Sequence, residues 1–190
     1  MTGMMAEPSF LYEKLLLALP AIGDPRFHHS VIALCSDTEE GAMGVGIGTV
    51  VEGITVGDLL QQFDIEPAET FDQPVHFGGP VEMRRGFVLH SLDWGGQEVV
   101  QVGASWAVSG SLDILKAIAT GAGPSRWLMA LGYAGWGAGQ LEAELTEHAW
   151  HLADYDQRLM YEVPAGDRWA SAFAGQGVDP SKIASVGGRA

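Results

Sequence analysis

Two histidines and an aspartate near the end of the chain have the spacing of metal ligands. His148, His151 and Asp154 follow one another at intervals of three residues, which would place them on one face of a continuous helix. Imidazole and carboxylate groups on one face can bind zinc. The segment 150–154, however, is typical of a helix exit or a following strand, which would separate the three side chains. We therefore interpret these histidines as structural or surface residues and predict no metal site.

Cys35 is the only cysteine and the one candidate for thiol chemistry. It cannot form an internal disulfide. It ends an apolar stretch and is followed by Asp37, Glu39 and Glu40, and both burial and nearby acids raise the pKa of a thiol and make it unreactive. We therefore expect a small core residue, with an enzyme or redox-responsive protein that uses a pocket near Cys35 as the alternative.

Motifs for nucleotide binding and acyl transfer are incomplete. The 26 glycines include no phosphate-binding loop with lysine, and the glycine pairs 44/46 and 46/48 lack the third glycine of a dinucleotide-binding turn. The segment 103–107 ends in alanine where a nucleophile elbow needs glycine, so Ser105 is not predicted to be a nucleophile. No catalytic residue and no cofactor is predicted.

The charge of the chain is strongly negative. There are 24 Asp and Glu against 10 Lys and Arg, a net charge of −14, which argues against direct binding of nucleic acid because that requires a basic footprint. Between Arg26 and Arg84 there are ten acids and no lysine or arginine. This interval is either a solvated acidic face or a docking face for a basic partner. The six tryptophans are expected to anchor the core, since stacking platforms for single strands lie in basic grooves.

Length and hydropathy favour one soluble domain. A chain of 190 residues corresponds to about one domain, and the apolar stretch 15–23 is about half of the ~20 residues that a membrane span requires. Segment 1–10 contains no basic residue and is not typical of a signal peptide. We expect a cytoplasmic protein without membrane contact, with residues 1–10 poorly ordered.

Short apolar runs bounded by turn residues predict the strands. We expect strands over residues 14–20 and 29–35, in which His28 and His29 point apart, and a third over 42–48. In the third, the glycines at 44, 46 and 48 share one side, which predicts that another backbone or an aromatic ring lies close to it. Further strands are expected over 75–77, 87–90, 99–108 and 127–133.

Caps and apolar stripes predict the helices. Thr55 and Asp58 resemble a capping box before a short helix over 55–63, and Gly121 ends a helix over 111–120. The stripe Ala138, Leu141, Leu145 and Ala149 predicts a long helix over 137–149, and a last helix is expected over 167–175. The result is an α+β domain with several strands and about four helices.

Six stretches, in this order and spacing, resemble the YqgE/AlgH family (UPF0301, DUF179): HSVIALC at 29–35, EGAMG at 40–44, FGGPV at 77–81, RGFVLH at 85–90, LGYAGW at 131–136 and GQLEAEL at 139–145. The resemblance implies one domain over 1–190 with a mixed, mostly antiparallel, bifurcated sheet that forms a partial barrel. It attaches no reaction or cofactor to the chain. One branch is described as a transcriptional regulator of alginate production, a label that transfers by association only.

The chain departs from the family pattern at three places. Asp37 stands where the family has a histidine two residues after the cysteine, the segment 48–50 replaces an Asn-Arg-Pro-like turn, and His148 replaces an asparagine. A Cys-His pair that could activate the thiol is therefore absent from that position.

The matched motifs fall on loops and element ends, where binding residues are commonly placed. They define a candidate binding surface: Gly78, Gly79, Pro80, Arg85, Gly123, Pro124, Tyr133, Trp136, Gln140 and Glu144. We expect free N–H groups at Gly78 and Gly79. We also expect Arg85 to pair with a carboxylate, with Glu144 as the first candidate, or to line a pocket with Gln140. The alternative is that Arg85, Gln140 and Glu144 only tie a helix to the sheet.

The function predicted from these features is a non-enzymatic regulatory or interaction protein. Its partner would be a protein or a small-molecule ligand, and any effect on transcription would be indirect.

Overall fold

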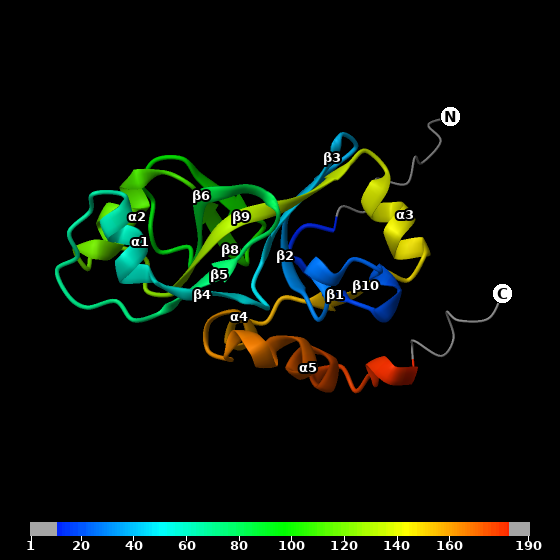
Figure 1. Cartoon of the computed structure of the whole chain (residues 1–190). Helices are drawn as coiled ribbons and strands as arrows, with labels where there is room; N and C mark the ends of the chain where they lie inside the picture. The colour runs from blue at the N-terminus through cyan, green and yellow to red at the C-terminus, as the bar shows by residue number, and fades with distance from the viewer. Residues whose placement is uncertain (1–10, 183–190) are drawn as a thin grey trace, which may run out of the picture.

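One long strand, β9 (Trp127–Gly137), is shared by the two halves of a mixed sheet in the computed structural model, which describes residues 11–182. The strand order is β10-β1-β2-β3-β9-β6-β8-β7, with β4 and β5 branching off beside β9 (Figure 1). The expected poorly ordered segment 1–10 lies outside the described residues. The strands are β1 (Lys14–Ala18), β2 (Val31–Thr38), β3 (Gly41–Gly46), β4 (Val50–Thr55), β5 (Pro74–Phe77), β6 (Val81–His90), β7 (Val99–Val102), β8 (Trp106–Ser109), β9 and β10 (Trp150–Asp154).

The sheet forks along one edge of β9. Residues Met129–Leu131 pair in parallel with β5, and Ala134–Gly137 pair antiparallel with β3, while β6 pairs with the opposite edge of the strand. Of the strand pairs in the described chain, only β5 with β9 is parallel. The predicted fold class is therefore confirmed: an α+β fold with a bifurcated, mostly antiparallel sheet that curls into a partial barrel.

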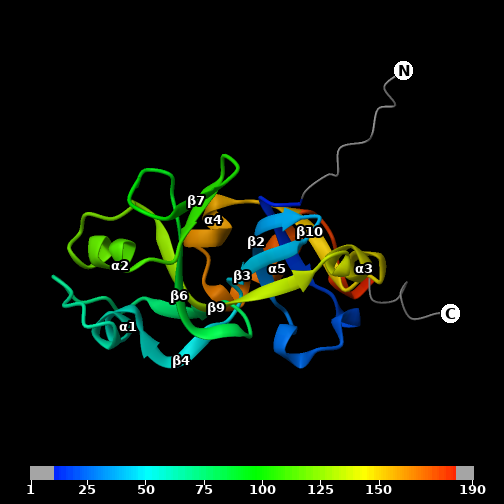
Figure 2. The same ribbon diagram turned by 90° about the horizontal axis from the view of Figure 1, so that it is seen from above.

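Helices cover the sheet at its ends and on one side. Helices α1 (Val56–Gln62) and α2 (Leu112–Ala119) pack at one end of the molecule, and α3 (Gln140–Thr146) lies at the other (Figures 1 and 2). Helices α4 (Gln157–Tyr161) and α5 (Ala165–Gly175) lie below the sheet in Figure 1, and a further helical turn begins at Pro180. In the described part of the chain, no helix has the length and apolar character needed to cross a membrane.

Four glycines meet where the sheet forks. A Cβ atom on Gly46 would lie 2.5 Å from the carbonyl oxygen of Phe77, and one on Gly78 would overlap the carbonyl oxygen of Gly132. Gly79 packs in the same way against the backbone of Tyr133, and Gly132 has a left-handed φ of 76°. These contacts confirm that another backbone lies close to the glycine side of β3. A chain with side chains at these positions could not bring β3, β5 and β9 together.

A buried arginine ties α5 to the underside of the sheet. Arg168 is 5% exposed, and its Nη1 donates to the carbonyl oxygen of Ile47 (2.6 Å) and to Nε2 of His76 (2.8 Å). Because a guanidinium only donates, Nε2 of His76 must accept, so Nδ1 carries the proton and donates to the carbonyl of Met129 (3.1 Å). Burial and the adjacent Arg168 lower the pKa of His76 to about 4, which keeps this ring neutral.

The capping box that was predicted before the first helix is present. The Thr55 hydroxyl accepts from the backbone N–H of Asp58 (3.2 Å), and the Asp58 carboxylate accepts from the backbone N–H of Thr55 (2.9 Å). Local chemistry is sufficient here, because both partners lie within one turn.

The long helix expected over 137–149 is wrong in its bounds. Its first residue, Gly137, belongs to β9 and pairs with Gly41, and the helix α3 spans only Gln140–Thr146. Tertiary pairing with β3 outweighs the local helical pattern, and Gly139, with a φ of 75°, turns the chain from strand to helix. Trp150 then opens β10, so the alternative of a following strand holds.

Two further strand predictions need correction. The run 99–108 is not one strand but a hairpin of β7 and β8, which turns at Gly103 with a φ of 54°. Ser105 lies in that turn and its hydroxyl donates to Glu13 (3.1 Å). His28 and His29 precede β2, and because His29 has a left-handed φ of 53° their rings stack 4.0 Å apart instead of pointing apart.

A methyl group added at Gly132, where the sheet forks, should lower the free energy of unfolding by more than the backbone strain alone would. Gly132→Ala and Gly139→Ala both place alanine at a left-handed φ, which costs about 1–2 kcal/mol. Only Gly132 has backbone atoms in the way, whereas Gly139 has nothing within 4 Å. We expect Gly132→Ala to lose about 1–3 kcal/mol more than Gly139→Ala in urea unfolding followed by tryptophan fluorescence. Equal losses would show that the fork tolerates a side chain.

The neutral His76 should make stability depend on pH. Its folded pKa of about 4 lies below the ordinary value near 6.5, so the unfolded chain binds the proton more readily. The contribution of neutral His76 to the free energy of unfolding is therefore complete above about pH 6.5 and is lost as the pH falls toward 4. The loss amounts to at most about 3 kcal/mol.

The variant His76→Gln tests this, since an amide can accept from Arg168 and donate to Met129 without titrating. Urea unfolding at several pH values should show a shallower loss of stability on acidification for His76→Gln than for the wild type. Exposed His148, replaced by asparagine, serves as the control and should leave the slope unchanged. A wild-type slope in His76→Gln would contradict the assignment.

Candidate functional site

Two hollows lie on either side of the C-terminal end of strand β9, and Gly135 and Trp136 line both of them. The first is an open groove of about 610 Å³, which Arg85, Phe87 and Tyr133 line. The second, more enclosed, is a cavity of about 230 Å³ between α3, the loop 20–27 and the turn at Pro80. Six of the ten candidate residues line one hollow or the other: Pro80, Arg85, Tyr133, Trp136, Gln140 and Glu144.

Glu144 is the polar centre of the cavity. Its Oε2 accepts from the indole Nε1–H of Trp136 (2.6 Å) and of Trp150 (3.1 Å), and its Oε1 accepts from the Gln140 amide (3.3 Å). The Gln140 Oε1 in turn accepts from the backbone N–H of Gly137 (3.0 Å). Gln140 and Glu144 thus tie α3 to β9 and β10, as the structural alternative expected, and they also line the cavity.

Three aromatic rings form the walls beside this carboxylate. Trp136 and Trp150 meet edge to face with centroids 6.0 Å apart, and Phe27 meets Trp150 in the same way at 5.9 Å. Such edge-to-face contacts are the favoured packing of rings, and they hold the indoles at the angle that brings both N–H groups to Glu144.

Arg85 lies beside a carboxylate as predicted, but that carboxylate belongs to Glu82 and the favoured partner, Glu144, was wrong. Arg85 lies 3.6 Å from Glu82, and its guanidinium lies 4.9 Å from the ring centroid of Phe87. The cause is an irregularity in β6, whose register with β9 shifts between Val81 and Gly86 and where Glu82 takes a φ of 47°. The segment 82–85 therefore carries Arg85 to the groove, while Pro80 and Gln140 line the cavity.

The glycines of the candidate surface have a different place. Gly78 and Gly79 are buried at the fork, and the N–H of Gly78 donates to the carbonyl of Leu131 (2.8 Å), so it is not free as predicted. Gly123 packs against Ile118, just after α2, and Pro124 follows it. Figure 1 shows α2 at the opposite end of the molecule from α3, so these two residues lie apart from the other candidates.

The three residues with metal-ligand spacing are not brought together. His148 follows α3 with a φ of 59°, His151 on β10 contacts Gln176 (2.7 Å), and Asp154 pairs with Lys14. Within residues 11–182, no group of three acidic, cysteine or histidine side chains has the arrangement of a metal site.

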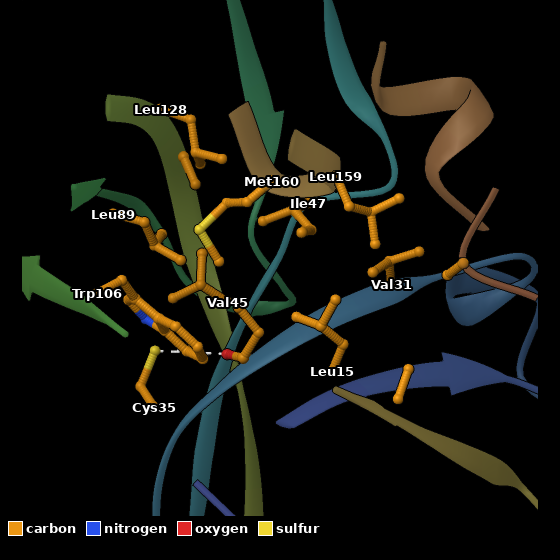
Figure 3. Packing of buried hydrophobic residues seen from close by; sticks show 14 of the residues in the cluster. Leu15, Val31, Cys35, Val45, Ile47, Leu89, Trp106, Leu128, Leu159 and Met160 are labelled. Atoms are coloured by element: carbon orange, nitrogen blue, oxygen red, sulfur yellow. Dashed lines mark hydrogen bonds between the residues drawn. The ribbon is translucent and has the colours of Figure 1, made fainter. Parts of the chain in front are cut away.

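Cys35 points into the main core. It is 6% exposed, its thiol donates to the carbonyl of Ala33 (3.4 Å), and its sulfur lies beside the indole of Trp106 (Figure 3). Burial raises the pKa of this thiol to about 12, against the smaller opposite effects of Trp106 and Val45. The expected unreactive core cysteine fits this environment.

A serine and a histidine also meet inside the core. Nε2 of His90 lies 2.9 Å from the hydroxyl oxygen of Ser109, with both residues at most 1% exposed. Their burial separates them from any substrate in solution, and the contact ties β6 to β8. The other ring nitrogen of His90 lies 2.8 Å from the carbonyl of Ser91.

Asp24, Phe27 and Trp150 are among the cavity residues that sequence reasoning missed. Asp24 and Phe27 belong to the loop between β1 and β2, and Trp150 reaches the cavity because β10 pairs with β1. The sequence did contain a signal for Trp150, because Trp136 and Trp150 flank the pair Gln140 and Glu144, which are four residues apart. Only the fold, however, shows that both indole N–H groups face the Glu144 carboxylate.

Comparison with known proteins gives a consistent assignment. A family model described as AlgH-like (DUF179) matches residues 15–181. A UPF0301 protein of Sphingopyxis alaskensis is 54% identical over 187 residues, which cover 98% of this chain and all of the relative. One of Novosphingobium aromaticivorans is 51% identical over 186 residues, with 98% and 100% covered.

Solved structures share the fold. The solution structure of the AlgH protein from Pseudomonas aeruginosa superimposes with a TM-score of 0.78 at 37% identity and covers all of both chains. A protein from Corynebacterium diphtheriae superimposes with a TM-score of 0.72 at 20% identity, with 90% of this chain and 88% of the other covered, which shows likeness of fold alone.

The thiol of Cys35 should react slowly. With a pKa of about 12, it stays protonated at pH 8, and its burial blocks reagents. We expect labelling by a disulfide reagent at pH 8 to be at least about 100-fold slower than for free cysteine, whose pKa is near 8.5, and to become fast in urea. Labelling at the free-thiol rate in the folded protein would revive the redox alternative.

Proposed function

Given that the chain belongs to the AlgH-like (DUF179, UPF0301) family, we propose that it is a non-enzymatic regulatory or interaction protein that binds a protein or small-molecule ligand at the end of β9. Any effect on transcription would be indirect, through that ligand or partner, and the cytoplasm would be its compartment.

The distribution of chemical groups carries this proposal. The groove and the cavity at the end of β9 are open to solvent and hold aromatic, amide and charged side chains, the kinds of group that line binding sites. Cys35 and the Ser109–His90 pair are buried in the core instead. The described residues that line the two hollows include the Ser36 and Thr38 hydroxyls but no cysteine, histidine or lysine, and this composition favours binding over covalent catalysis.

The charge distribution supports a partner other than nucleic acid. Of the cations near the site, Arg85 already lies beside Glu82 and over Phe87, and the chain as a whole carries −14. A phosphate backbone would meet repulsion over most of the surface. A ligand or a basic partner would not.

Filling the groove should abolish partner binding. A Cβ atom at Gly135 meets only Tyr133, at the ordinary contact distance of 3.6 Å, so Gly135→Leu should fold and project into the groove. We expect proteins captured from native lysate by the immobilised wild type to be lost, at least about tenfold, with Gly135→Leu, since blocking a binding centre removes most of the affinity.

The matched control is Leu112→Gln, which changes an exposed side chain on α2 at the opposite end of the molecule. It should capture the wild-type set of partners. If Gly135→Leu captures the same set as the wild type, or if the purified protein steadily consumes a metabolite from cell extract, the proposal is wrong.

A further inference from the structure

We propose that the cavity beneath α3 is a receptor for a guanidinium group, with Glu144 as its charged contact and the rings of Phe27, Trp136 and Trp150 as its walls. This inference rests on the proposed function, because it names the chemistry that one of the two hollows recognises.

Glu144 is a carboxylate held by neutral groups. Both indole N–H groups and the Gln140 amide donate to it, and these donors fix its position without cancelling its charge. Among the side chains that the structure describes, no lysine or arginine forms an ion pair with it. A half-buried negative charge therefore remains at the cavity, where it favours a cation.

The rings next to the carboxylate add a second attraction for a cation. Each indole has a single donor, and both indoles use it on Glu144. The ring surface that lines the cavity belongs to 7% exposed Trp136, 4% exposed Trp150 and half-buried Phe27, and the negative face of an aromatic ring attracts cations. Aromatic rings combined with a carboxylate are the common composition of sites that bind organic cations.

The size of the cavity limits the ligand. Its volume of about 230 Å³ is below the ~300–1,000 Å³ of sites for drug-sized molecules. It suits one side chain or a small headgroup, and it excludes a nucleotide. Asp24 also lines the cavity.

A planar cation fits these contacts better than a compact one. A guanidinium can donate from its edge to a carboxylate while its face lies on an aromatic ring, and it is more weakly hydrated than an ammonium group. The ligand is therefore either a small free guanidino compound or the arginine side chain of a partner protein, and the two sources are separated by the probes below.

Isothermal titration calorimetry at low salt tests the proposal on the full chain. The probes are methylguanidinium for a free compound, N-acetyl-argininamide for a protein side chain, and N-acetyl-citrullinamide as the neutral analogue of similar shape. We expect the arginine probe to bind at least tenfold more tightly than the citrulline probe, and to shift the indole N–H resonances of Trp136 and Trp150 in the NMR spectrum. Tighter binding of methylguanidinium than of the arginine probe would identify a free compound, and the reverse would identify a side chain.

Removal of the Glu144 charge provides a second test of the proposal. Glu144→Gln keeps the shape of the side chain and should weaken the arginine probe at least tenfold. Glu142→Gln, an exposed residue of the same helix, removes the same charge and should change affinity less than twofold. If Glu144→Gln does not fold, the comparison of arginine and citrulline probes on the wild type still decides.

The proposal is overturned if the citrulline probe binds as tightly as the arginine probe, if N-acetyl-lysinamide binds equally well, or if Glu144→Gln and Glu142→Gln behave alike. Absence of probe binding together with capture that Gly135→Leu abolishes would refute the guanidinium site and leave the proposed function intact. Binding of the arginine probe by a protein that also steadily consumes a metabolite would refute the non-enzymatic proposal and leave the guanidinium site intact.

Discussion

The backbone contact between Gly78 and Gly132 governs the arrangement of this molecule, because β3 and β5 can share one edge of β9 only where no side chain intervenes. β5 ends at Phe77 and the chain turns at once through Gly78 and Gly79, whose backbone lies directly on that of Gly132 and Tyr133. The N–H of Gly46 donates to the carbonyl of Gly78 (2.7 Å), which joins β3 to the same point. The parallel β5 and the antiparallel β3 thus follow each other along β9, and the sheet divides there.

The fork also determines where the candidate site lies. Beyond it, β6 starts with an irregular segment that pairs with β9 only at Val81 before the register resumes at Gly86. That segment separates Pro80, which lines the cavity, from Arg85, which lines the groove. The last residues of β9 therefore have a hollow on either side, and Trp136 contributes to both.

Prediction from the sequence succeeded for features that neighbouring residues determine, and it failed for features that depend on the pairing of strands distant in the sequence. The capping box at Thr55 and Asp58 lies within one turn, and the glycines of β3 signal a close backbone by their absence of side chains. The helix expected from residue 137 was shortened because Gly41, almost one hundred residues earlier, pairs with Gly137. Gln140, Glu144 and Trp136 could be placed together from the sequence because they lie within nine residues of one another. Phe27 and Trp150 could not, since only the pairing of β1 with β10 brings them to the cavity.

Arg168, which is buried, and Glu144, which is half-buried, carry charges of opposite sign, and their surroundings give them different roles. Arg168 donates to two backbone carbonyls and to His76, is 5% exposed, and has its pKa lowered to about 10 by burial. The charge of Arg168 interacts only with groups inside the fold, and these neutral dipoles offset the cost of its desolvation. Glu144 is likewise held by neutral dipoles, two indoles and an amide, but it borders a cavity that opens to solvent. A charge that is oriented yet not neutralised, and that a ligand can reach, is poised for recognition. In a chain with a net charge of −14, a site of this kind selects cations twice, first by the long-range field and then by the carboxylate itself.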